Sequence, residues 1–240
     1  MSGHSKWATI KRAKEAKDAK RGNIFTKLGN NITVAARNGG DPEINFSLRI
    51  AIDKAKAANM PKDNIERAIK RGTGELGGAQ IEELTYEGFG PAKTGFIIEV
   101  LTDNKNRSAA EIRHLFTKHG GSLGSLNSVS WNFDHLAVIR IVQENLPQNA
   151  DELELELIDA GADDIKKENE GMTILTAIEN FQKIKKLLDQ KNIKTESAGI
   201  EYIVKDEKEI SEEEKKKVEQ FIEALDENDD INNYYTDVNI

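Results

Sequence analysis

LAVIRIVQENLPQNADELELELIDAGADDIKKENEGMTILT, residues 136–176, decides the fold, because two strand-like apolar runs flank a segment with helical spacing. Short runs rich in Val, Ile and Thr are typical of strands, and apolar residues three to four apart indicate a helix. With the residues that follow, the predicted order is strand, helix, strand, strand, helix, strand: 136–142, 151–160, 163–168, 172–176, 177–191 and 193–204. This order predicts a split βαβ unit of the ferredoxin-like kind over residues 136–205.

The residues on either side of this unit predict a second α+β domain that is interrupted by it. Strand patterns cover 81–88 and 95–102, and Ser108 with Glu111 resembles a capping box that opens a helix running towards His119. Val129, Trp131 and Phe133 alternate as a half-buried strand would. Two or three strands and one helix make a thin domain, so we expect elements from the C-terminal end to complete it.

Those later elements are a helix and a strand. Ser211 with Glu214 is a second capping box, followed by Val218 and Phe221 on a helix and by a last strand near Tyr234 and Tyr235. If they complete the interrupted domain, the residues around Tyr234 lie next to those around Phe96. The predicted middle domain therefore spans 79–135 plus 206–240, and residues 136–205 are inserted into it.

Residues 1–75 predict a basic tail and a three-helix domain. Three apolar stripes at helical spacing are formed by Phe25, Leu28, Ile32 and Ala35, by Leu48, Ile52 and Ala55, and by Ile65, Ala68 and Ile69. Gly39-Gly40 ends the first stripe, Pro61 fits the first position of the third helix, and Gly72 ends it. GTGELGG, residues 72–78, is interpreted as a hinge. The fold class is thus multidomain α+β, with a helical domain followed by two nested α+β domains.

Charge is distributed unevenly along the chain. The 240 residues carry a formal net charge of -8, yet residues 1–75 hold 16 Lys and Arg against 8 Asp and Glu. The rest has 18 against 34, so the two parts carry +8 and -16. Because fields decay over about 8 Å at physiological salt, a ligand senses the local patch, and the basic end should attract nucleic acid.

Other features of the composition narrow the classes of function. The chain has no cysteine, which excludes thiol chemistry, and its longest apolar runs are too short to span a membrane. We also find no secretory signal pattern at the start, so we expect a cytoplasmic protein. The sequence leaves the oligomeric state open and slightly favours a monomer.

The opening stretch, GHSKWATIKRAKEAKDAKRG at residues 3–22, carries cations that would surround a helix rather than follow one face. This pattern is typical of a segment that tracks phosphates, and its alternative is a solubilising tail. Trp7 could stack on a base, although it more readily anchors the tail. In MPKDNIERAIKRG, residues 60–72, the exposed cations favour phosphate contact over base reading, for which Asn64 and Arg67 would be available.

Catalysis and metal binding find little support in the remaining motifs. His114 and His119 are five residues apart, whereas a helical metal pair needs four, so we expect no metal site, no cofactor and no catalytic residue. Asp103 starts a turn, and Arg107 could grip a phosphate or a neighbouring carboxylate. Tyr86 and Phe89 could stack on bases, but a turn that packs them is favoured. The acidic runs at 212–214 and 226–230 are expected to stay solvated.

Five stretches of the sequence together resemble the YebC/PmpR family, and the resemblance extends over essentially the whole chain. These stretches are GHSKWATIK, RGNIFTK, NMPKDNIERAIKRG, YEGFGP and LTDNKNRSAAEIRHLFTKHGG. The resemblance implies three domains in the nested order above and control of gene expression rather than catalysis. Bacterial relatives are described as DNA-binding transcriptional regulators; the alternative is a ribosome-associated translation factor that contacts ribosomal RNA or tRNA. By position, the implied nucleic-acid contacts are Lys6, Lys11, Arg12, Lys14, Lys17, Lys20, Arg21, Lys27, Lys62, Arg67, Lys70 and Arg71.

One segment departs from the family pattern. Gly29, Asn30 and Asn31 stand where relatives commonly carry larger or charged residues. A glycine inside a helix costs about 1 kcal/mol relative to alanine, so this helix is expected to be weaker and less basic. Phosphate recognition is shared by DNA and RNA, and the sequence leaves the choice between them open.

Overall fold

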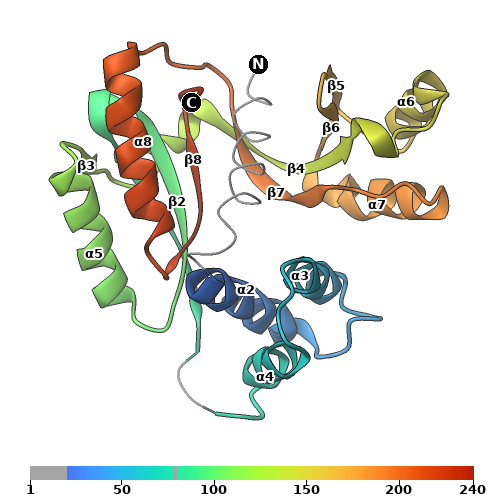
Figure 1. The fold of residues 1–240 in the computed structure, drawn as a ribbon, viewed down its shortest axis with the longest axis horizontal. Helices are drawn as coiled ribbons and strands as arrows, with labels where there is room; N and C mark the ends of the chain where they lie inside the picture. Colours follow the sequence, from blue (N-terminus) through green and yellow to red (C-terminus); the bar gives the residue numbers. More distant parts are fainter. Residues whose placement is uncertain (1–20, 78–79) are drawn as a thin grey trace. The chain divides into compact units, whose positions relative to one another are not determined.

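The computed structural model describes residues 21–77 and 80–240 (Figure 1). These residues form two compact units, one of residues 132–207 and one that joins the preceding residues to 208–238. The second unit holds the N-terminal helices and an α+β part. Each unit is described separately, and the boundaries 1–75, 79–135 plus 206–240, and 136–205 stay a prediction.

The unit of residues 132–207 is the predicted split βαβ unit. Its elements are β4 (Phe133–Val142), α6 (Ala150–Asp159), β5 (Asp164–Glu168), β6 (Gly171–Thr176), α7 (Phe181–Gln190) and β7 (Ser197–Val204). The antiparallel sheet has the order β5-β6-β4-β7, which is the ferredoxin-like arrangement. Leu157 of α6 and Leu188 of α7 are fully buried, so each helix contributes its apolar stripe to this core.

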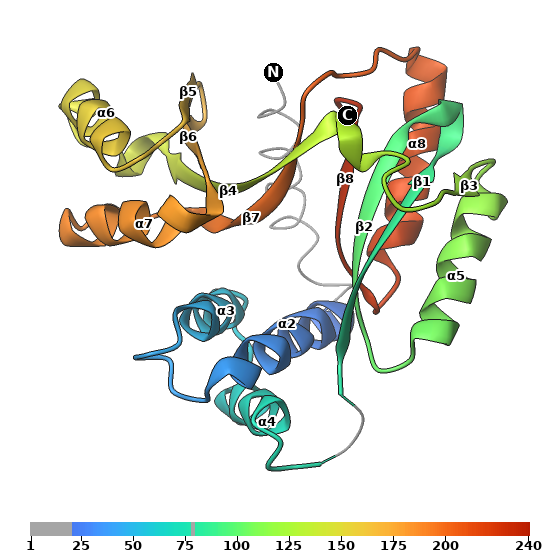
Figure 2. The ribbon, with the colours of Figure 1, turned by 180° about the vertical axis from the view of Figure 1, so that it is seen from behind.

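The α+β part of the other unit is built from both sides of that insertion, as predicted. Its elements are β1 (Glu82–Phe89), β2 (Gly95–Thr102), α5 (Lys105–Lys118), β3 (Ser122–Leu123), α8 (Glu212–Asp226) and β8 (Ile231–Thr236). The sheet order is β3-β1-β2-β8, and Tyr234 pairs with Ile98 in an antiparallel ladder. Figure 2 shows β2 beside β8, although about 130 residues separate them in sequence.

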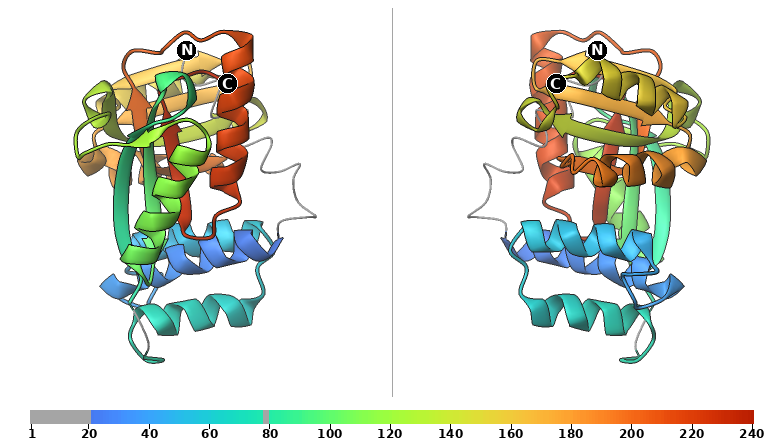
Figure 3. Two further views of the ribbon diagram at one scale, coloured as in Figure 1. Left: turned by 90° about the vertical axis from the view of Figure 1, so that its left-hand side faces the viewer. Right: turned by 90° about the vertical axis from the view of Figure 1, so that its right-hand side faces the viewer.

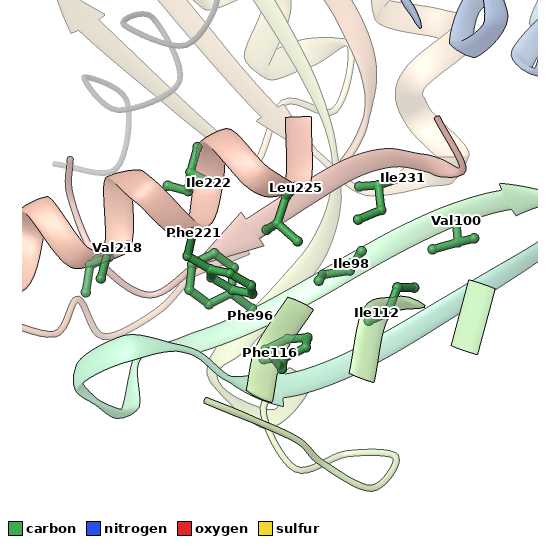
Figure 4. Close-up of a cluster of buried hydrophobic side chains, with 11 residues drawn as sticks. Phe96, Ile98, Val100, Ile112, Phe116, Val218, Phe221, Ile222, Leu225 and Ile231 are labelled. Carbon is green, nitrogen blue, oxygen red and sulfur yellow. The ribbon is translucent and has the colours of Figure 1, made fainter. Parts of the chain in front are cut away.

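Two helices, one from each side of the insertion in the sequence, close this sheet (Figure 4). Ile112 and Phe116 of α5 meet Phe221 and Leu225 of α8 over the β2 side chains. The Phe221 ring packs edge-on against Phe96 at 4.9 Å between centroids and lies 5.0 Å from Phe116. Because the core needs α8, the elements after residue 207 are structurally part of a domain that begins near residue 81.

The N-terminal helices form the expected three-helix part, with α2 (Arg21–Ala35), α3 (Phe46–Ala57) and α4 (Lys62–Gly72). The predicted stripes are confirmed, since Ile32, Leu48, Ile52 and Ile65 lie in one buried cluster. Figure 3 shows α4 running alongside α2. Pro61 is the N-cap residue rather than the first helical residue, so α4 begins at Lys62, one residue later than predicted.

Four local predictions were wrong. Helix α5 begins at Lys105, because Asn104 caps it by accepting from the Arg107 N–H, and Ser108 is buried inside the helix. Residues 130–132 form a 3-10 turn rather than a strand, since Glu87 takes the backbone N–H groups of Val129 and Ser130 that a ladder would need. Helix α7 and strand β7 both start four residues later than predicted, after a 3-10 turn over Ile178–Asn180 and after a loop.

The prediction that the whole acidic run 226–230 stays solvated was also wrong. Asp230 has a side chain only 13% exposed, and its carboxylate accepts from Ser108 Oγ at 2.6 Å and from the Arg107 guanidinium at 3.1 Å. The local pattern of the run could not show this, because both donors lie on α5, more than 120 residues earlier.

Candidate nucleic-acid interface

Helix α4 is the described element that carries most of the predicted contact residues. A four-residue connection, Ala58 to Pro61, joins it to α3, and Asn59 in that turn has a positive φ of 59°. Ile65 and Ala68 bury one face of α4 against α2. The hydroxyl of Thr33 donates to the Ala68 carbonyl at 3.1 Å, which fixes the helix on its support. The opposite face of α4 is therefore held in a defined orientation towards solvent.

Gly72 explains how closely the two helices approach. A Cβ at this position would overlap the Thr33 carbonyl oxygen and lie 2.6 Å from the Ala36 Cβ. Only glycine allows the last turn of α4 to pack at this distance. Gly72 is thus a packing residue at the end of α4 rather than simply the first residue of a hinge.

The four cations of α4 fall into two groups. Lys62 lies 3.5 Å from Glu66 one turn later, and the Arg71 guanidinium lies 3.9 Å from the Asp103 carboxylate. Arg67 and Lys70 are exposed, and within the described residues neither forms an ion pair. Their positive charges are therefore the α4 charges most available to a polyanion.

Helix α2 contributes differently. The Lys27 ammonium donates to the Asp226 backbone carbonyl at 3.0 Å, and Asn31 donates to the Asn232 side chain. Lys27 is therefore half-buried and engaged within the protein. Arg21 is the first residue of α2. The other six predicted contacts lie outside the described residues: Lys6, Lys11, Arg12, Lys14, Lys17 and Lys20.

Helix α3 carries cations that the sequence analysis did not assign. Arg49 and Lys56 are exposed, and the Arg49 guanidinium lies over the Phe46 ring at 5.2 Å. Asn45 fixes the start of α3, because it accepts from the Leu48 N–H and donates to the carbonyls of Ala35 and Gly39. Residues opposite the Leu48 and Ile52 stripe could have been predicted to face solvent from helical spacing alone. Residues 21–77 hold ten Lys and Arg against six Asp and Glu, so the described helices keep a positive balance.

The polar segment that follows β2 is occupied internally. Arg107 forms ion pairs with Asp230 and Asp103. Its hydrogen bonds to Asp230 are the main cause that raises the pKa of the Arg107 guanidinium. Of the two partners considered for Arg107, the structure shows the carboxylate. A polar hollow of about 500 Å³ lies beside this pair, lined in part by Arg71, Asn30 and Glu111.

His114 lies on α5, and His119 is the C-cap residue of that helix. His119 packs its ring 5.5 Å from Phe221, and burial followed by the charge of Lys118 lowers its pKa, so the ring is neutral near pH 7. In the part of the chain that the structure describes, no group of three metal-binding side chains comes together. Across the same residues, no helix is both long and apolar enough to cross a bilayer.

Tyr86 and Phe89, considered as a stacking platform, point to different environments. Tyr86 is half-buried against the α5 and α8 core, and burial raises the pKa of its hydroxyl. Phe89 is 38% exposed at the end of β1, opposite Ser122 of β3. The favoured prediction was a turn that packs both rings; the Tyr86 ring is packed, but from strand β1 rather than from a turn, and Phe89 stays exposed.

Comparison with known proteins assigns the chain to a family. The family model described as the TACO1/YebC protein N-terminal domain matches residues 5–75, and that described as TACO1/YebC second and third domain matches 81–238. The chain belongs to the TACO1/YebC family. The resemblance seen in the sequence motifs is thereby confirmed.

Individual members of the TACO1/YebC family match along nearly their whole length. A protein of Thermoanaerobacter pseudethanolicus, named a probable transcriptional regulatory protein, is 52% identical over 100% of this chain and 98% of its own. One of the same description from Caldanaerobacter subterraneus is 48% identical, with 100% and 99% covered. The crystal structure of a conserved hypothetical protein, Aq1575 from Aquifex aeolicus, has a TM-score of 0.82 and 40% identity, and covers 92% of this chain and 91% of that one.

Proposed function

We propose that this protein is a non-enzymatic regulator of gene expression that binds DNA through its basic N-terminal region. The observation that carries the proposal is the polarised charge: +8 over residues 1–75 against -16 over the rest. Its relatives named probable transcriptional regulatory proteins support the regulatory role. The contact residues are the seven basic residues of the opening stretch and α2 start, Lys27, and the α4 set.

The geometry of α4 supports contact with phosphates. Arg67 and Lys70 sit on the face turned away from α2, and no carboxylate in the described chain neutralises either of them. Each cation that neutralises a phosphate releases condensed counterions, so affinity falls as salt rises, with a slope of about 0.9 per contact on duplex DNA. Binding that arises this way is steep in salt and weakly dependent on sequence.

Fluorescence anisotropy of a labelled DNA duplex at several salt concentrations tests this proposal. Replacing Lys11, Arg12, Lys14, Lys17, Lys20 and Arg21 by Ser should weaken binding and flatten the salt slope by up to about 5. The double variant Arg67→Ser/Lys70→Ser should flatten it by about 2. Lys186→Ser/Lys194→Ser in the other unit is the matched control, since it removes two exposed lysines and should change nothing. Unchanged slopes in the first two variants would refute the assignment.

A second function uses the same chemistry. Ribosomal RNA presents the same phosphates, so a ribosome-associated translation factor that contacts ribosomal RNA or tRNA is the alternative. Transcriptional regulation by direct readout requires a promoter that competes better than random duplex, and equal competition by all duplexes would count against it. Co-sedimentation with ribosomes at low salt favours the translation factor. Crosslinking in cells, followed by sequencing of the recovered nucleic acid, separates the two directly.

A further inference from the structure

Helix α2 presents a polar stripe to the end of helix α8. Asn23, Lys27 and Asn31 are four residues apart, so their side chains follow one face of α2. Each of them donates a hydrogen bond to the segment in which α8 ends and β8 begins. Three successive turns of α2 are therefore attached to the α+β part. The three bonds run from Asn23 Nδ2 to the Glu227 carbonyl at 3.1 Å, from Lys27 Nζ to the Asp226 carbonyl at 3.0 Å, and from Asn31 Nδ2 to Asn232 Oδ1 at 2.6 Å.

This contact suits the end of α8 chemically. The last carbonyl groups of a helix have no partner within it, and they form the negative end of the helix dipole. Helix α8, which the structure describes over its whole length, has no basic residue in its last turn. Lys27 places a cation there from another part of the chain, and Asn23 donates to a second carbonyl. The end of α8 is thus stabilised by a helix of the basic N-terminal region.

Two ion pairs join the same parts at a second place. The Arg71 guanidinium, at the end of α4, lies 3.9 Å from the Asp103 carboxylate, and that of Arg37 lies 3.8 Å from Glu83. Glu83 is paired with Leu101 in the β1–β2 ladder, so Glu83 and Asp103 lie at the same end of this strand pair. The four charged side chains are 36–61% exposed, so salt screens both pairs and each stabilises the contact only weakly.

These three hydrogen bonds and two ion pairs, which we call the docking contact, compete with nucleic acid for the same cations. The apolar side chains of the three helices and those of the α+β part form two separate clusters. Polar contacts of this kind are typical of domains that move relative to one another. The docking contact occupies Lys27 and Arg71, two of the cations predicted to bind phosphates. A phosphate must displace or share the Asp226 carbonyl or the Asp103 carboxylate to reach them.

We infer that the docking contact is autoinhibitory, so that nucleic acid must undock the three helices from the α+β part before it can use Lys27 and Arg71. The inference rests on the proposed nucleic-acid function and adds the regulation of its site. Charge supports it, because residues 1–75 carry +8 and the rest carries -16, so the acidic part competes with phosphates. The affinity of the whole chain is then reduced in proportion to the undocked fraction.

A neutral substitution tests this inference without changing the charge. Asn232→Ala removes the acceptor of Asn31 and leaves every cation in place. It should tighten the binding of a labelled duplex by up to about two- to tenfold, the factor that one neutral hydrogen bond contributes to docking. Asn233→Ala is the matched control, because Asn233 donates to Glu99 within the α+β part, and it should bind as wild type. Equal tightening in both variants would refute the inference.

Carboxylate substitutions separate undocking from general repulsion. Glu83→Gln removes the partner of Arg37, whereas Glu82→Gln removes one exposed carboxylate at the adjacent position of β1. Both variants weaken the repulsion of a polyanion to the same extent. A larger gain in affinity for Glu83→Gln is therefore the result expected from undocking. Equal gains for the two variants would contradict it.

Distances between spin labels measure undocking directly. The chain has no cysteine, so labels can be attached at Ser47→Cys on α3 and Gln220→Cys on α8, both exposed positions. We expect one main distance in the free protein. Saturating duplex should add longer distances, and Asn232→Ala should raise their share without duplex. If Asn232→Ala did not fold, Asn23→Ala would carry the same prediction, since it removes the bond to the Glu227 carbonyl.

The outcomes distinguish the two proposals. Binding that depends on the basic N-terminal residues, with Asn232→Ala binding as wild type and label distances unchanged by duplex, would overturn this inference and leave the proposed function intact. Absence of binding to DNA and RNA, in the wild type and in Asn232→Ala alike, would overturn both.

Discussion

Replacement of Glu87 by Gln tests how the loop of residues 124–132, between β3 and β4, is held. The Glu87 carboxylate accepts three backbone N–H groups, two on one oxygen and one on the other. Glutamine keeps one acceptor oxygen for Val129 and Ser130 and turns an NH2 group towards the Asn127 N–H. Each charged hydrogen bond that becomes neutral loses about 1 kcal/mol, and an orphaned N–H costs about 1–3 kcal/mol. We therefore expect Glu87→Gln to lower the free energy of unfolding by about 3–5 kcal/mol at pH 7.

The effect should depend on pH in a defined direction. Burial alone would raise the pKa of Glu87, but the N–H groups of Val129, Ser130 and Asn127 outweigh it and hold that pKa below the ordinary 4.5. A carboxyl group with a lowered pKa in the folded state contributes stability that is complete above its unfolded pKa. This contribution is lost as the pH falls through the folded pKa. The gap between wild type and Glu87→Gln should thus be constant from pH 6 to 8 and shrink below about pH 4.5.

Urea titration followed by Trp131 emission, in a Trp7→Phe background, measures this gap. Glu82→Gln is the matched control, because Glu82 lies exposed on the same strand, and surface changes of this kind stay within about 0.5 kcal/mol. A loss below about 1 kcal/mol at pH 7 would show that Glu87 does not hold the loop. A full loss that persists unchanged to pH 3 would show that packing, rather than the charge, is responsible.

Further predictions concern packing and buried charge, each measured by urea or thermal unfolding. Gly29→Ala should stabilise α2 by about 0.5–1 kcal/mol, since a Cβ there meets no atom within 4 Å; a loss would mean that the glycine is needed. Gly72→Ala should instead cost about 1–3 kcal/mol, because its Cβ would overlap the Thr33 carbonyl, and an unchanged midpoint would contradict that close approach. Arg140→Met should cost about 3–5 kcal/mol by removing the bidentate partner of Glu201 from a site where Arg140 is 2% exposed; a near-neutral result would show that the pair is dispensable.

The sequence predicted the fold well where a local period decides the element. Apolar stripes such as the one with Leu48 and Ile52 predicted the helices. The alternation of strand and helix patterns predicted the strands and the nested order of the domains. It failed where a distant group competes for the backbone. Glu87 lies more than 40 residues before Val129, yet it removes the N–H groups that a strand at 129–132 would use. Ser108 and Asn104 both suit a helix N-cap, and Asp230, far along the chain, takes the hydroxyl of Ser108.

The candidate site shows the same division between local and distant information. Spacing alone placed Arg67 and Lys70 opposite the Ile65 stripe, and both are exposed. The Lys62 and Glu66 pair was also readable, because four residues separate them on one helix. The partner of Arg71 was not readable, since Asp103 lies on the far side of a strand pair. The sequence pattern alone does not distinguish the four cations of α4. The ion pairs show that they should not contribute equally to phosphate binding.

The unequal contributions of the α4 cations to phosphate binding should be measurable in the salt dependence of binding. A cation that already faces a carboxylate must give up or share that contact before it neutralises a phosphate, so it gains less from binding. Arg71 lies 3.9 Å from the Asp103 carboxylate, whereas Arg67 forms no ion pair within the described chain. We expect Arg67→Ser to flatten the salt slope by about 1 and Arg71→Ser by clearly less. Equal slopes for the two variants would mean that the ion pair opens at no cost when nucleic acid binds, and that charge count alone governs this interface.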